Sequence, residues 1–190
     1  GDYLLIGLQN QSKLTLDSVD VTATAGPYSG YMPNAQSIYV QEGSHLIIEN
    51  GSNLQLGANQ INLSQGSTLD MSGSTVTTAS ATTIFAGAST VNITDSTVTS
   101  NGIGIVVKGS TANITGSATS NITADNDAIQ VTGQNNTLKV HGATVNSSAA
   151  AALHVVSGAT LTNNDAIIID GNSTFTAPRS EEHTSEIQSR

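Results

Sequence analysis

Two short segments carry the aspartates that are best placed to do chemistry. The segment ADNDAIQV contains Asp125 and Asp127, and the segment NNDAIIID contains Asp165 and Asp170. Carboxylate pairs that cleave glycosidic bonds lie about 5–10 Å apart in a cleft, and the oxygens of Asp125 and Asp127 would also suit Ca²⁺. The asparagine-rich surroundings favour solvated turn residues instead. We therefore predict no catalytic residue, no metal site and no cofactor.

The histidines and serines do not form a recognisable catalytic motif in the sequence. His45, His141 and His154 are widely separated, and none belongs to an H-E-x-x-H zinc motif. The chain has no G-x-S-x-G turn. It also has no cysteine, which excludes thiolate ligands, disulfides and cysteine nucleophiles. The segment GIGIVVKG lacks the G-K-[ST] ending of a phosphate-binding loop, so we expect a core strand there.

The charge of the chain limits its partners. The net charge is −9, and only 10% of the residues are charged. Residues 1–178 contain three cations, Lys13, Lys108 and Lys139, which are too few to form a basic patch for nucleic acid. No apolar run reaches about 18 residues, so we expect no direct insertion into a membrane.

The last twelve residues, RSEEHTSEIQSR, differ from the rest of the chain. They contain both arginines, Arg179 and Arg190, whereas residues 1–178 contain none. When RSEEHTSE is read back into codons, it resembles a common short-read sequencing adapter, and Gln188 and Ser189 continue the match. We therefore expect residues 179–190 to be a non-native, disordered tail, and we assign no role to its His183.

A repeat of about 22 residues organises residues 1–178. Glycines that follow apolar residues recur at intervals of 21 to 25 residues, in segments such as TIFAG, AIQVTG and LHVVSG. These glycines are Gly43, Gly66, Gly87, Gly109, Gly133 and Gly158. An earlier copy, QSKLTLDSVDV, has Gln11 at the glycine position. The repeat thus has seven copies, with an insertion at residues 25–36.

Alternation within each copy predicts short strands. In TLDMSGSTV, the side chains of Leu69, Met71 and Val76 can point to one side while Asp70 points to the other. One copy buries too few aliphatic side chains to offset the entropy of ordering its backbone, so the copies must stack. We predict an all-β, right-handed parallel β-helix of about seven coils, roughly 34 Å long at about 4.8 Å per coil. A β-sandwich is the competing fold.

Several blocks of the repeat resemble the passenger regions of bacterial autotransporters of the pertactin-like and AIDA-like adhesin kind. The blocks are GSTLDMSGSTVTT, ASTVNITDSTVTS and GQNNTLKVHGATVNSS, and the absent cysteine and scarce arginine agree with them. The resemblance covers about residues 10–176. It implies a secreted or surface-displayed β-helix, with a C-terminal β-barrel translocator in the full-length protein. The filamentous haemagglutinin-like exoproteins of two-partner secretion are similar in style.

The resemblance implies a non-enzymatic rod that contacts a receptor of a host cell or matrix, or other bacterial cells. The insertion AGPYSGYMPNAQ offers candidate contact residues at Pro27, Tyr28, Tyr31 and Pro33, because functional loops are often inserted on rigid scaffolds and tyrosine is favoured at contact surfaces. A cap over the end of the stack is the alternative role of this loop.

Two other functions remain open at this stage. Polysaccharide lyases and hydrolases share the β-helix fold, although their anionic substrates are usually held by Arg or Lys. Ice binding is suggested by the Thr-x-Thr pairs Thr75/Thr77 and Thr97/Thr99. On the next two coils we expect the pairs Ser117/Thr119 and Thr144/Asn146 at the same position.

Overall fold

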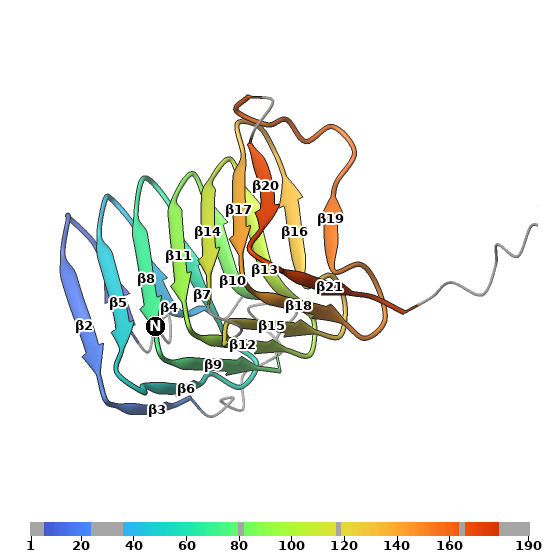
Figure 1. The fold of residues 1–190 in the computed structure, drawn as a ribbon. Helices are drawn as coiled ribbons and strands as arrows, with labels where there is room; N and C mark the ends of the chain where they lie inside the picture. Colours follow the sequence, from blue (N-terminus) through green and yellow to red (C-terminus); the bar gives the residue numbers. More distant parts are fainter. Residues whose placement is uncertain (1–5, 24–35, 80–81, 117–118, 164–165, 179–190) are drawn as a thin grey trace, which may run out of the picture.

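The computed structural model describes residues 6–23, 36–79, 82–116, 119–163 and 166–178. All helices and strands assigned in these residues are β-strands; none is helical. The strands wind as successive coils around one axis (Figure 1). Each coil contributes one strand to each of three seven-stranded sheets. All neighbouring strands within the sheets are parallel.

Neighbouring strands of a sheet are every third strand along the chain, so β1 pairs with β4 and β4 with β7. The first sheet contains β1 (Ile6–Leu8), β4 (Gln36–Val40), β7 (Gln60–Leu63), β10 (Thr82–Gly87), β13 (Ile103–Lys108), β16 (Ile129–Thr132) and β19 (Leu153–Val155). The second contains β2 (Lys13–Asp17), β5 (His45–Glu49), β8 (Thr68–Ser72), β11 (Thr90–Thr94), β14 (Thr111–Thr115), β17 (Thr137–His141) and β20 (Ile167–Asp170). The third contains β3 (Asp20–Thr22), β6 (Asn53–Gln55), β9 (Thr75–Thr78), β12 (Thr97–Ser100), β15 (Asn121–Ala124), β18 (Thr144–Ser147) and β21 (Thr174–Thr176).

The length of the coils is regular in the middle of the stack and longer at both ends. In the second sheet, successive register partners at Leu46, Leu69, Val91, Ala112 and Leu138 are 23, 22, 21 and 26 residues apart. The first and last intervals, from Leu14 to Leu46 and from Leu138 to Ile167, are 32 and 29 residues. The predicted parallel β-helix is confirmed, but about five coils, not seven, follow the regular repeat of about 23 residues.

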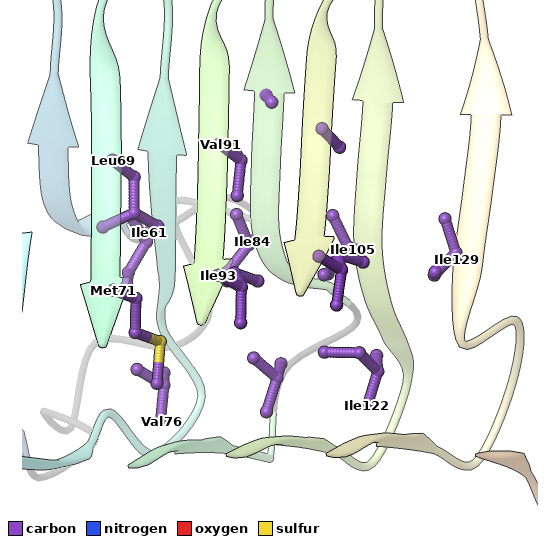
Figure 2. Close-up of a cluster of buried hydrophobic side chains, with 14 of the residues drawn as sticks. Ile61, Leu69, Met71, Val76, Ile84, Val91, Ile93, Ile105, Ile122 and Ile129 are labelled. Carbon is purple, nitrogen blue, oxygen red and sulfur yellow. The ribbon is translucent and has the colours of Figure 1, made fainter. Parts of the chain in front are cut away.

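The core is a narrow column of aliphatic side chains along the axis. Leu69, Met71 and Val76 all point inward and are no more than 1% exposed, as the alternation predicts (Figure 2). The register stacks identical side chains on successive coils, because Ile84 of β10 pairs with Ile61 of β7 and with Ile105 of β13. No aromatic residue of the described chain belongs to the fully buried core.

Buried serines occupy two of the corners between sheets. They are Ser44, Ser67, Ser89 and Ser110 at the corner before the second sheet, and Ser52, Ser74, Ser96 and Ser120 at the corner after it. The Ser110 hydroxyl accepts a hydrogen bond from the Ser89 amide (3.0 Å) and donates one to the Ala86 carbonyl (2.9 Å). In the described residues, no buried side-chain nitrogen or oxygen lacks a partner. The corners therefore hold neighbouring coils in register without an unsatisfied polar group.

The predicted glycine column lies at the corner before the second sheet. Gly43 and Gly66 have φ angles of 70° and 74°, and their amides donate to the carbonyls of the next coil. Gly87 is an exception, because it ends β10 and the left-handed turn residue is Ala88, with φ 48°. The sequence repeat therefore marked this corner to within one residue.

The stacked core predicts a strong contrast between two neighbouring positions of β11. Ile93 is fully buried, whereas Thr94 is exposed at the end of the same strand. We expect Ile93→Ala to lower the free energy of unfolding by about 2–5 kcal/mol, because it leaves a cavity in the core. Thr94→Ala is the control and should stay within about 0.5 kcal/mol of the parent. Urea unfolding followed by circular dichroism measures both, and equal losses would contradict the inward orientation of Ile93.

Candidate functional site

Each histidine of the described chain meets an aspartate of a neighbouring coil. His45 Nε2 lies 2.6 Å from Asp70 Oδ2, and His141 Nδ1 lies 2.6 Å from Asp170 Oδ1. The third pair joins His154 Nδ1 to an oxygen of Asp127 at 2.7 Å. The partners are 25, 29 and 27 residues apart in sequence, which is about one coil. Sequence reasoning missed the pairs because it compared histidines with each other rather than with residues one repeat away.

Asp127 is the most enclosed acid of the described chain, at 8% exposure. Its carboxylate also accepts hydrogen bonds from Gln130 Nε2 (3.0 Å) and from the Ala151 amide (3.2 Å). Burial acts to raise the pKa of Asp127, but the hydrogen bonds from His154, Gln130 and Ala151 outweigh it, so the pKa lies below its ordinary value. The ionised carboxylate of Asp127 therefore connects its own coil to the next one through His154 and the Ala151 amide.

Asp125, the other acid of ADNDAIQV, has a different environment. It is exposed and accepts a hydrogen bond from the Ser148 hydroxyl at 3.1 Å. Both aspartates therefore bind residues of the next coil. Within the described part of the chain, no group of three or more acidic or histidine side chains could hold a metal ion.

The second sheet carries a hydrogen-bonded row on its outer face. Asp70 Oδ1 accepts from Asn92 Nδ2 (2.7 Å), and Asn92 Oδ1 accepts from Asn113 Nδ2 (2.8 Å). Since Asp70 also contacts His45, the row links the outer face of four consecutive coils. Such ladders of polar side chains are a known means of stabilising stacked parallel strands.

A shallow cavity of about 280 Å³ lies where the second sheet turns into the third, near the C-terminal coils. It is lined by Gly116, Gly142, Ala143, Thr144, Gly171, Asn172 and Thr174. Its lining contains no acid or base, so these residues alone offer no proton transfer. The backbone is tightly packed there, because a Cβ added to Gly142 would lie 2.1 Å from the Gly116 carbonyl oxygen.

Several residues that the sequence singled out lie outside the described residues. They are Pro27, Tyr28, Tyr31 and Pro33 of the candidate contact loop, Asp165, Ser117, and the tail 179–190. The segment GIGIVVKG forms β13, the core strand that was predicted for it.

The register of the third sheet corrects one of the predicted threonine pairs. The pair that follows Thr97/Thr99 is Asn121/Thr123, not Ser117/Thr119. β14 ends at Thr115 and β15 begins at Asn121, whereas only two residues separate β11 from β12, so β15 begins later than the even repeat implied. Thr119 instead donates a hydrogen bond to Asp95 Oδ1 at 2.6 Å.

Comparison with known proteins agrees with this geometry. The family model described as the right-handed beta helix region matches residues 5–175. The chain belongs to the right-handed β-helix family. This match confirms the predicted right-handed winding. The family includes both enzymes and non-enzymes, so membership does not decide whether this chain is an enzyme. No curated protein and no solved structure matches the chain.

Among the described residues, no helix has the length and apolar character needed to cross a membrane.

The enclosed carboxylate of Asp127 in this β-helix predicts a pH-dependent loss of stability. We expect Asp127→Asn to lower the free energy of unfolding at pH 7 by about 1–3 kcal/mol, because it removes a charge-assisted hydrogen bond. The lowered pKa of Asp127 stabilises the fold above the pKa of an unfolded aspartate, about 3.9. The difference from the parent should therefore shrink as the pH falls through the folded pKa.

The matched control for this prediction is Asp125→Asn, which changes an exposed acid of the same turn. Urea unfolding at several pH values between neutral and strongly acidic measures all three proteins. A difference between Asp127→Asn and the parent that is independent of pH would contradict the assigned role of the carboxylate.

The packing of Gly142 predicts a sharp effect of a single methyl group. Gly142 and Gly51 both have left-handed backbones, with φ 65° and 80°, but a Cβ at Gly51 would meet nothing within 4 Å. Gly51→Ala should destabilise by about 1–2 kcal/mol, the cost of the left-handed conformation. Gly142→Ala should lose clearly more, as measured by thermal unfolding, because the Gly116 backbone must also move. Equal losses would contradict the close approach.

Proposed function

We propose that this β-helix is a non-enzymatic adhesive rod of the autotransporter-passenger kind, displayed at the cell surface or secreted. The observation that carries the proposal is the continuous aliphatic column inside three parallel sheets. A column of this kind forms a stiff shaft, and its outward side chains can change without disturbing the core. Its proposed partners are a receptor on a host cell or matrix, or other bacterial cells.

The first sheet provides contact residues within the described part of the chain. Tyr39, Asn62 and Phe85 are successive register partners on β4, β7 and β10, and all three point away from the core. The neighbours Ile84 and Ala86 of Phe85 are fully buried, which fixes its outward direction. Half-buried aromatic side chains on an outer face are typical of protein contact surfaces.

The polar groups that could support catalysis are engaged in contacts between coils. Asp127 binds His154 and the Ala151 amide of the next coil, and Asp125 binds Ser148 of the next coil. These contacts give the acids a structural role, which supports a non-enzymatic function over a polysaccharide lyase or hydrolase.

A binding assay tests the adhesive function. Beads coated with the full chain should bind cultured epithelial cells or immobilised matrix proteins saturably. We expect Tyr39→Ser and Phe85→Ser to weaken this binding, because they remove aromatic contact area, while Asn62→Ser of the same row is the control. Bound beads are counted by flow cytometry. The absence of saturable binding to either surface would contradict the proposal.

A second assay separates the rod from an enzyme. Incubation of the full chain with pectin and alginate should release no unsaturated uronides, measured by their ultraviolet absorbance, and no reducing ends. Release of either product by the parent, and its loss in Asp127→Asn, would contradict the non-enzymatic function and favour the lyase or hydrolase.

A further inference from the structure

The third sheet presents two straight rows of outward side chains from β9 to β21. The pairs on successive coils are Thr75/Thr77, Thr97/Thr99, Asn121/Thr123, Thr144/Asn146 and Thr174/Thr176. Eight of these ten positions are threonine and two are asparagine. The residue between each pair points into the core, so the alternation of the strands holds both rows on the outer face. The observed register thus makes the rows more complete than the sequence suggested.

The threonine hydroxyls of these rows are left to solvent. Among the described residues, none of the eight has a hydrogen-bond partner for its side chain, whereas Thr78, Thr119 and Thr137 elsewhere do. Threonine has few side-chain rotamers because it is branched at Cβ. The rows therefore form a stiff array of hydroxyl and methyl groups that loses little entropy when it is covered.

The face also lacks the groups that other ligands require. None of its ten outward residues is charged or aromatic. The second sheet, in contrast, carries Asp70, Lys139 and His141 on its outer face. Acidic or basic polymers would find no opposite charge among these ten residues, and sugars would find no ring on which to stack.

The spacing of the array follows from the backbone. Strands of neighbouring coils are about 4.8 Å apart, and side chains two residues apart on one strand are separated by about 6.6 Å. The hydrogen bonds between strands fix the repeat of about 4.8 Å between coils, and the extended backbone fixes the repeat of about 6.6 Å along each strand. The repeat of about 4.8 Å is close to the shorter repeat between equivalent oxygen atoms on a face of hexagonal ice.

We propose that the outer face of the third sheet, from β9 to β21, binds ice. The hydroxyl and amide groups occupy positions equivalent to oxygens of the ice surface, and the methyl groups lie between them and release loosely held water. The ice-binding face is independent of the proposed adhesive function, because the two use different sheets.

Thermal hysteresis, the gap between the melting and freezing temperatures of an ice crystal in the protein solution, tests the proposal. The parent chain should produce a gap and inhibit recrystallisation of fine-grained ice. Thr97→Lys and Thr99→Lys should abolish both effects, because each places a long charged side chain within the array. Thr90→Lys is the control, since Thr90 points outward from the second sheet on the same coil.

Circular dichroism and thermal unfolding establish that all four proteins keep the parent fold, so a lost gap reports the surface alone. A fluorescently labelled parent should also coat an ice crystal that the labelled Thr97→Lys variant leaves bare. A folded parent without hysteresis or recrystallisation inhibition would overturn the proposal. Equal activity of the parent and both third-sheet variants would overturn it as well, as would loss of activity in Thr90→Lys.

Discussion

Each coil of this protein depends on its neighbours, because the backbone groups of its strands bond only to the coils above and below. The interval between register partners therefore constrains everything else. It places Ile61, Ile84 and Ile105 above one another in the core. It also brings the Ser110 hydroxyl to the Ser89 amide at a corner. The fold needs no fully buried aromatic residue, because the narrow shaft is filled mainly by aliphatic side chains.

The same constraint separates stability from function. Most inward positions are aliphatic in every coil, whereas outward positions are limited only by strand propensity and solubility. The three outer faces accordingly carry different kinds of side chain. The first carries Tyr39 and Phe85, the second carries charged residues and the polar row at Asp70, and the third carries the threonine rows. One scaffold can thus offer an aromatic contact surface and an uncharged lattice at the same time.

Most of the fold could be predicted from the sequence, since alternation and an even repeat are local patterns. Leu69, Met71 and Val76 were assigned to the core on alternation alone. The candidate site was less accessible, because contacts between coils depend on the length of each turn. β15 begins at Asn121, later than the even repeat implied, so the pair on this coil is Asn121/Thr123. The pairing of His154 with Asp127 likewise required the observed register.

The register between coils is the central claim, and spin labels test it directly. The chain has no native cysteine, so nitroxide labels at Thr75→Cys and Thr97→Cys report one distance. These positions are register partners on adjacent coils, about 4.8 Å apart at Cα, so their spectrum should show strong spin exchange. Labels at Thr75 and Thr144, three coils apart, should show none. Weak coupling in the first pair, or equal coupling in both, would contradict the stacked β-helix.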